Sequence, residues 1–254
     1  MRVHVAFLPS LVLQYGLPVD SEPPASGPDR LRRQVCMVVD VIRASTSLVT
    51  LVERGATPIY IASDVASARA AAASRDGVVL AGEEDGLAPA GFNYGNSPVE
   101  LSGARVAGRP VIFVTTNGTA AIRAVEGAAA VLVGALRNGT AVCREAWQTA
   151  RQRDADVTIV CAGREKAFGM DDAYCAGYLV DRLLELGPAE LTDGTQTALR
   201  LYRAEPDARA LFQSSAAGQN VIRLGLAHDV EYCAQRDTSS AVPRLGREIF
   251  LLPS

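Results

Sequence analysis

The sequence predicts an α/β protein with a mostly parallel sheet flanked by helices and a smaller C-terminal portion of helices and short strands. Short apolar runs rich in β-branched residues alternate with segments of helical length rich in alanine, leucine and arginine, which is the pattern of strands joined by crossover helices. Most of the runs lack an apolar–polar alternation, as expected of strands covered on both faces. The 254 residues are 48% hydrophobic, enough for a full core without disulfide or metal staples.

The order of the elements follows from these runs. The predicted strands are residues 3–8, 35–40, 58–62, 78–81, 111–115, 130–133 and 157–161. The predicted helices between them are 45–54, 64–74, 118–126, 139–153 and 172–186, the last one stopped by Gly187 and Pro188. The alanine-rich stretch 66–73 needs no special explanation, because alanine is the best helix former.

Two further segments interrupt this pattern. Residues 18–33 hold four prolines among polar residues, which predicts a solvated, mobile insertion. Beyond residue 187 the predicted helices 195–204, 207–214, 218–225 and 228–236 precede a strand pair at 239–242 and 248–252. We therefore expect residues 1–187 to form an α/β domain with most of the site, and 188–254 a smaller portion packed on it.

The charge balance and the cysteines restrict the class of protein. The chain has 25 basic and 28 acidic side chains for a net charge of −3, which argues against disorder and against nucleic-acid binding. The five cysteines are an odd number without a C-x-x-C pair, typical of free thiols in a reducing compartment. No apolar run has the length of a signal or a membrane span. We expect a cytoplasmic protein that binds neither nucleic acid nor membrane.

Several common catalytic motifs are missing. No two glycines stand two residues apart, so the dinucleotide fingerprint G-x-G-x-x-G is absent. The only lysine, Lys166, lies between Glu165 and Ala167, which excludes a Walker A loop. There is no G-x-S-x-G elbow. The two histidines, His4 and His228, are too few for a histidine-rich zinc site.

Polar residues gather at four predicted strand ends, where ligands of open α/β sheets bind. The four groups are Asp40 with Arg43, Ser45 and Thr46; Glu83 with the loop that holds Asn96 and Ser97; Asn117, Gly118 and Thr119; and Arg164 with Asp171 and Asp172. Each group alone also fits a plainer interpretation, either helix capping or a solvated turn. Four such ends together favour a binding site.

The residue types at these ends indicate the chemistry. Carboxylates without histidine or cysteine partners select a hard cation, which is usually Mg²⁺ where phosphate oxygens share its coordination. The planar guanidinium of arginine binds oxyanions with two parallel hydrogen bonds. The 24 arginines could equally reflect genomic base composition. The residues alone suggest metal-assisted phosphoryl chemistry on a small anion, and they leave hydrolysis and transfer open.

An ordered set of motifs resembles the 2-phosphosulfolactate phosphatases of coenzyme M biosynthesis, often called the ComB family. The matching stretches are DVIRAST at 40–46, GE at 82–83, GF at 91–92 with GNSP at 95–98, TTNGT at 115–119, CAG at 161–163, DDAYCAG at 171–177, DVEYCA at 229–234 and VP at 242–243. The resemblance implies a three-layer α/β/α fold. It also implies a Mg²⁺-dependent phosphatase that converts 2-phospho-3-sulfolactate to 3-sulfolactate and phosphate.

The resemblance also assigns roles to the residues at the strand ends. The implied catalytic residues are Asp40, Arg43, Glu83 and Asp172. The implied metal ligands are Asp40, Glu83, Asp171 and Asp172. The implied substrate ligands are Ser45, Thr46, Asn96, Ser97, Asn117, Gly118, Thr119 and Arg164. Whether Asp40 forms an aspartyl-phosphate or ligates the metal stays open.

Two departures from the family pattern leave the substrate open. Glu84 and Asp85 follow Gly82-Glu83 where the family commonly has a basic residue, and Asp171 is shorter than the usual glutamate. The alternatives are therefore a phosphatase of another small 2-phosphoacid, or a non-catalytic anion-binding protein of the same fold. The apolar pattern does not predict an oligomeric state.

Overall fold

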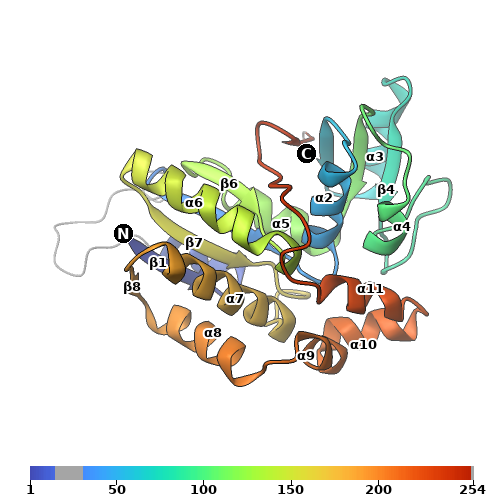
Figure 1. Cartoon of the computed structure of the whole chain (residues 1–254). Helices are drawn as coiled ribbons and strands as arrows, with labels where there is room; N and C mark the ends of the chain where they lie inside the picture. The colour runs from blue at the N-terminus through green and yellow to red at the C-terminus, as the bar shows by residue number, and fades with distance from the viewer. Residues whose placement is uncertain (15–30, 253–254) are drawn as a thin grey trace.

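The computed structural model describes residues 1–14 and 31–252 and confirms the α/β class (Figure 1). The predicted insertion at 18–33 lies largely outside these residues. All strand pairings within the two sheets are parallel. The strands form two separate sheets, a division that the apolar runs did not reveal. None of the described helices is long and apolar enough to cross a membrane.

The first sheet has five strands in the order β6-β2-β7-β1-β8. Its members are β1 (Arg2–Ala6), β2 (Gln34–Val39), β6 (Ala130–Val133), β7 (Asp156–Cys161) and the short β8 (Glu190–Leu191). Every residue of β2 is buried. Val35, Met37 and Val39 pack into one core cluster and Cys36 and Val38 into another, which explains why this strand shows no apolar–polar alternation.

The second sheet has four strands in the order β4-β5-β3-β9. Its members are β3 (Ile59–Ala62), β4 (Val79–Gly82), β5 (Val111–Val114) and β9 (Ile249–Leu251). The last strand of the chain thus pairs with β3, far away in sequence. The predicted strand pair at 239–242 and 248–252 is wrong in its first member, because that segment is irregular and only the second finds a strand partner.

The predicted helices all form, with ends shifted by a few residues. They are α2 (Ala44–Glu53), α3 (Val65–Ala73), α5 (Thr116–Ala124), α6 (Gly139–Arg153), α7 (Met170–Leu186), α8 (Asp193–Ala204), α9 (Ala208–Ser214), α10 (Ala216–Arg223) and α11 (Ala227–Cys233). Short elements not predicted are the strand β8, the helix α4 (Pro98–Ser102) and the 3-10 turns η1 (Pro9–Gln14) and η2 (Leu136–Asn138).

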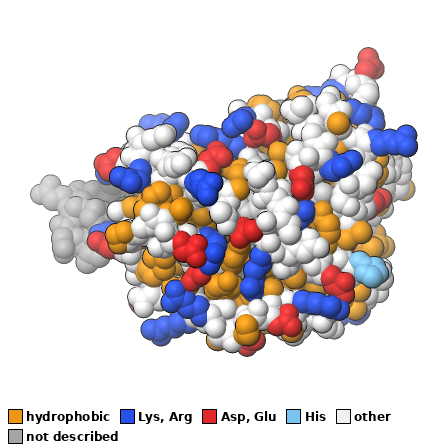
Figure 2. Space-filling view, in the orientation of Figure 1, with side chains coloured by type: hydrophobic (Ala, Val, Ile, Leu, Met, Phe, Trp, Pro, Cys, Tyr) orange, Lys and Arg blue, Asp and Glu red, His pale blue; other side chains and the backbone are white. Residues whose placement is uncertain are grey.

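The core clusters define the layers. One cluster joins the first sheet to α6, α7 and α8, and a second joins its other face to α2, α5 and the second sheet. The first sheet is therefore the middle of a three-layer α/β/α arrangement. A third cluster packs α3 on the outer face of the second sheet. On the face shown in Figure 2, basic and acidic side chains are interspersed, in keeping with the small net charge.

The C-terminal portion packs closely on the rest of the chain. Helix α8 lies against α7 at Gly177, where an added Cβ would stand only 2.0 Å from the carbonyl oxygen of Ala198. This contact leaves no room for a side chain. The division into domains at residue 187 stays a prediction.

The α7–α8 contact gives a testable outcome. Gly177→Ala should lower the free energy of unfolding by about 2 kcal/mol or more, because overpacking a rigid contact outweighs the gain in helix propensity. Urea denaturation measures the change. Gly103→Ala is the matched control, since its Cβ would stand 3.7 Å from its nearest neighbour and its φ is negative. Equal stability of the two variants would contradict close packing at Gly177.

Candidate active site

A cavity of about 680 Å³ opens where strands of both sheets end. It is lined by residues that follow β2 and β7 of the first sheet and β4 and β5 of the second, and by the first turns of α5, α7 and α10. Parallel strands direct their carboxyl ends to one edge, and the N-termini of the following helices present backbone N–H groups there. The fold thus brings together strand ends that are far apart in sequence.

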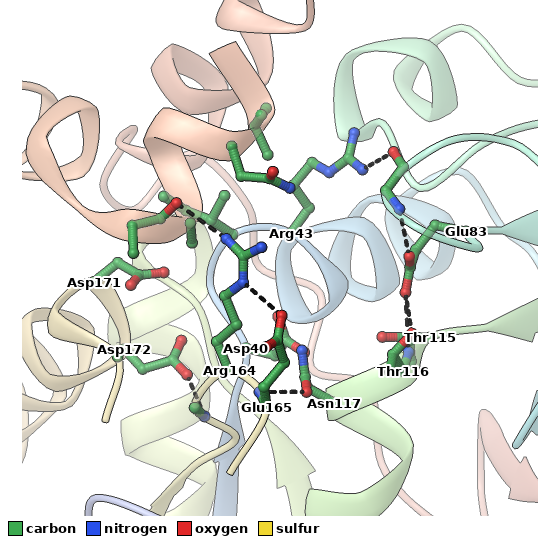
Figure 3. Close-up of a pocket in the computed structure, with 18 of the residues that line it drawn as sticks. Asp40, Arg43, Glu83, Thr115, Thr116, Asn117, Arg164, Glu165, Asp171 and Asp172 are labelled. Atoms are coloured by element: carbon green, nitrogen blue, oxygen red, sulfur yellow. Dashed lines mark hydrogen bonds and ion pairs between the residues drawn. The ribbon is translucent and has the colours of Figure 1, made fainter. Parts of the chain in front are cut away.

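Three buried aspartates lie in this cavity (Figure 3). Asp40 follows β2, and its Oδ1 accepts a hydrogen bond from the backbone N–H of Ala44 at 3.4 Å. Asp171 and Asp172 open α7. The two oxygens of Asp172 accept the backbone N–H groups of Val41 at 2.8 Å and Gly163 at 3.0 Å. The predicted carboxylates of two strand ends therefore meet in one place.

The protonation of these carboxyl groups is strongly altered by their surroundings. The pKa of Asp40 is raised to about 7, mainly by burial and also by the nearby charges of Asp171 and Glu83, while the hydrogen bond from Ala44 opposes the rise. Burial likewise raises the pKa of Asp171 to about 6. The pKa of Asp172 lies well above its usual range because of burial and the charges of Asp171 and Asp40. Each carboxylate opposes ionisation of the others.

The cavity wall carries more acidic than basic groups. Among its described lining residues are six carboxylates, on Asp40, Glu83, Asp85, Glu165, Asp171 and Asp172, and two guanidiniums, on Arg43 and Arg164. An anionic ligand would meet a repulsive field here unless a cation accompanied it.

Glu83 fixes the loop that follows β4. Its Oε1 accepts the backbone N–H of Thr116 at 3.0 Å and the hydroxyl of Thr116 at 2.8 Å. Its Oε2 accepts the backbone N–H of Gly86 at 2.8 Å. Glu83 lines the cavity as predicted, while both of its oxygens hold the start of α5 and the 83–86 loop.

Arg43 is held by a partner that the sequence analysis did not predict. Its guanidinium donates to Asp229 Oδ2 at 2.9 Å and to the carbonyl oxygen of Gly86 at 2.6 Å. Both side chains of the Arg43–Asp229 ion pair are almost fully buried. Arg43 lines the cavity, with part of its donor capacity used inside the protein. An acidic residue in the first turn of a helix ordinarily signals only a favourable helix dipole, so nothing in the sequence marked Asp229 as its partner.

Asn117 and Arg164 lie in the cavity as predicted. Arg164 donates to the carbonyl oxygen of Ala216 at 3.2 Å, and its Nε stands 3.5 Å from Glu165 Oε1. Asn117 Oδ1 accepts the backbone N–H of Glu165 at 3.3 Å. These contacts connect the starts of α5 and α10 with the loop after β7.

Two predicted substrate ligands after β2 do not line the cavity. Ser45 Oγ accepts the backbone N–H of Asp40 at 3.3 Å, and Thr46 Oγ1 donates to the carbonyl oxygen of Val41 at 2.8 Å. The hydroxyls therefore hold the strand-to-helix turn, and neither of them caps the N-terminus of α2.

Ser97, Gly118 and Thr119 also lie behind the cavity wall. Ser97 Oγ donates to Asp229 at 2.5 Å, and Thr119 Oγ1 donates to the carbonyl oxygen of Thr115 at 2.8 Å. A Cβ at Gly118 would stand 3.2 Å from Asp40 Oδ2, so this glycine leaves space beside that carboxylate. All three residues therefore contact groups that form the cavity or lie directly behind it, and none of them lines the cavity.

Asn96 is a predicted ligand that does line the cavity. Its side chain is buried, and its Oδ1 has no hydrogen-bond partner in the described part of the chain. Its backbone oxygen accepts the hydroxyl of Ser47 at 3.1 Å, which fixes the residue. A buried acceptor without a partner is costly, and a bound donor or a hydrated cation would satisfy it.

Helix α10 forms a wall that the sequence analysis missed. Ala216, Ala217, Asn220 and Val221 line the cavity, together with Phe168 from the loop after β7. The sequence of α10 shows only an ordinary amphipathic pattern. Its place over the site results from tertiary packing, which no local signal could have indicated.

The carboxylate oxygens that line the cavity are the kind of ligand that Mg²⁺ uses in sites that bind phosphate. Among the described residues, no group of three or more Asp, Glu, His or Cys side chains is arranged so that it could hold a metal ion by itself. Mg²⁺ commonly binds through one or two carboxylates, with water and substrate phosphate completing its coordination. The buried carboxylates and the excess of negative charge therefore suit a cation that arrives together with an anionic substrate.

The raised pKa values predict a pH-dependent stability. Because the folded pKa of Asp40 is above its unfolded value, the stability of the metal-free protein should fall as the pH rises from about 4 through about 7. Thermal unfolding in EDTA should show a shallower loss of Tm in Asp40→Asn than in the wild type. Asp154→Asn, at a fully exposed site, should keep the wild-type slope. Identical slopes in all three proteins would contradict the raised pKa.

Comparisons with known proteins identify the family of this chain. The family model described as 2-phosphosulpholactate phosphatase matches residues 23–248. A protein of Deinococcus radiodurans named "Probable 2-phosphosulfolactate phosphatase" is 43% identical over 219 residues, 86% of this chain and 90% of the relative. Proteins with the same name from Thermus thermophilus (44% over 212 residues, 83% and 87%) and Symbiobacterium thermophilum (37% over 225 residues, 87% and 94%) are also similar. The chain therefore belongs to the 2-phosphosulfolactate phosphatase family, a family of phosphoric monoester hydrolases.

Proposed function

We propose that this protein is a Mg²⁺-dependent phosphatase that hydrolyses 2-phospho-3-sulfolactate to 3-sulfolactate and phosphate, as in coenzyme M biosynthesis. The observation that carries the proposal is the cluster of Asp40, Asp171 and Asp172 in a cavity bordered by helix N-termini. The names of the relatives from Deinococcus radiodurans and Thermus thermophilus suggest the substrate. Free thiols at all five cysteines support a reducing compartment, and we propose the cytoplasm.

The cluster is suited to hold the ion. We assign Mg²⁺ to Asp40 and Asp171, whose side chains are buried in the cavity. Asp172, predicted as a ligand, we assign to positioning, because both of its oxygens already accept backbone N–H groups. Glu83, predicted as a ligand, we assign to positioning, because its oxygens already hold Thr116 and Gly86. When bound, Mg²⁺ would neutralise phosphate oxygens and lower the pKa of a bound water.

The chain's own groups would bind and orient the phosphate ester. The first turns of α5 and α10 offer backbone N–H groups to its oxygens. Arg164 would neutralise negative charge at the cavity wall. Hydrolysis breaks the bond between phosphorus and the ester oxygen, which takes up a proton as the alcohol leaves, while the oxygen of water remains on the phosphate. A cavity closed by Phe168 and α10 suits a small substrate.

One observation favours a different substrate of the same class. Asp85 lines the cavity wall, where its charge would oppose a strongly acidic sulfonate. A carboxylate-only 2-phosphoacid would suffer less repulsion. The second candidate is therefore phosphatase activity toward another small 2-phosphoacid such as 2-phospholactate.

Phosphate release tests both candidates. The wild type should release phosphate from 2-phospho-3-sulfolactate with Mg²⁺ and not with EDTA, with a higher kcat/KM than for 2-phospholactate. Asp40→Asn should lower kcat/KM by about 100-fold or more, as expected for loss of a metal ligand. Asp154→Asn is the exposed control. A preference for 2-phospholactate would establish the second candidate, and no Mg²⁺-dependent release from either ester would indicate a non-catalytic anion-binding protein.

Ion binding can be tested without substrate. At pH 8, 10 mM Mg²⁺ should raise the wild-type Tm by about 3–6 °C, if the Kd is about 1 mM. The rise should be smaller at pH 5.5, where protons compete for Asp40. Asp40→Asn and Asp171→Asn should abolish it, and Glu83→Gln should retain it. Loss of the shift in Glu83→Gln alone would place the ion at Glu83 instead.

A further inference from the structure

We infer that Glu165 determines specificity by competing for Arg164 with the second acid group of the substrate. This group is the carboxylate or sulfonate that the substrate carries besides its phosphate. The inference rests on the proposed function for its choice of substrate, a phosphate ester that carries a further carboxylate or sulfonate. It concerns the end of the substrate that does not react. It is supported by the contacts of the loop after β7, by the charges around the cavity and by the weak Arg164–Glu165 ion pair.

The loop that carries both residues is a tight, well-anchored turn. Arg164 and Ala167 exchange two backbone hydrogen bonds of 3.0 and 2.8 Å, and Glu165 and Lys166 between them have φ values of 51° and 65°. The backbone N–H of Glu165 donates to Asn117. The backbone of Glu165 is thus fixed at the cavity independently of its side chain, so its carboxylate can move without disturbing the turn.

Arg164 is held at one end and loosely paired at the other. One end donates to the carbonyl oxygen of Ala216 at 3.2 Å, which keeps the guanidinium over the cavity, as Figure 3 shows. Its Nε stands 3.5 Å from Glu165 Oε1, and the two side chains are 37% and 81% exposed. An exposed pair of this kind contributes about 0–1 kcal/mol. An incoming anion can therefore replace the Glu165 carboxylate at little cost.

The other cavity arginine is less accessible to such an exchange. The Arg43 guanidinium is committed to Asp229 and Gly86, and its ion pair is almost fully buried. Removing a buried partner is far more costly than removing an exposed one. Of the two arginines in the described cavity wall, Arg164 is the one whose anion can be exchanged. With the phosphate at the aspartate cluster, the second acid group goes to Arg164.

In the absence of a ligand, the Glu165 carboxylate pairs with Arg164 in place of that acid group. A phosphate ester without a second acid leaves the Arg164–Glu165 pair intact and gains nothing from Arg164. An ester with a second acid gains the interaction with Arg164, reduced by the free energy of the pair that it breaks. Glu165 thereby sets how much advantage the second acid group confers.

A double-mutant cycle in binding tests the exchange. Isothermal titration calorimetry measures the Kd of 3-sulfolactate for the wild type, Glu165→Gln, Arg164→Gln and the double variant, in the presence of Mg²⁺. Glu165→Gln should tighten binding about two- to fivefold, the equivalent of an exposed ion pair. Arg164→Gln should weaken it, and Glu165→Gln should then have no further effect. Inorganic phosphate, which lacks a second acid group, should show no such coupling.

Asp85→Asn is the matched control for charge alone. Asp85 lines the same cavity and has a positive φ like Glu165, and the exchange does not involve it. Its removal should change the Kd of 3-sulfolactate by the same factor with or without Arg164. Equal gains from Glu165→Gln in both Arg164 backgrounds, or no binding of 3-sulfolactate to the wild type, would overturn the inference. Because the cycle measures binding, coupling without phosphate release would refute only the proposed function, and release without coupling only this inference.

Discussion

The two hydrogen bonds that Asp172 accepts from Val41 and Gly163 are the contact on which the site depends. They join the ends of β2 and β7, the two neighbouring central strands of the first sheet, to the start of α7. A carboxylate can be buried only if its oxygens receive such donors. The same contact that fixes the strand ends therefore places a buried carboxyl group at the base of the cavity, and the cation that we propose would favour its ionised form.

Two other polar contacts also fix the elements around the cavity. Glu83 connects the loop after β4 to α5, and the Arg43–Asp229 pair connects the start of α2 to α11. Each joins elements that are distant in sequence, and each ends at the cavity. The rigidity of the site thus comes from acidic and basic side chains whose partners lie inside the protein, buried at Asp172, Arg43 and Asp229 and half-buried at Glu83. The exposed Arg164–Glu165 pair is left free to respond to a ligand.

The sequence predicted those features that local pattern determines. Apolar runs identified the strands and helices, and carboxylates at strand ends identified Asp40, Asp171 and Asp172. The separation into two sheets was not predictable, because strands buried on both faces look alike in either sheet. The hydroxyls of Ser45 and Thr46 were ambiguous, since a cap and an anion ligand have the same local pattern. Asp229 and α10 reach the site through long-range packing, which leaves no mark in the nearby sequence.

The position of β9 has a consequence for synthesis of the chain. Strand β3 pairs on one side with β5 and on the other with β9, and residues 63–248 lie between the two strands. At typical translation speeds about ten to forty seconds pass between their emergence. During that time one edge of β3 offers unpaired backbone groups, and an open edge invites pairing with other chains. The nascent protein thus carries an open strand edge that can pair with other chains until residues 249–251 have emerged.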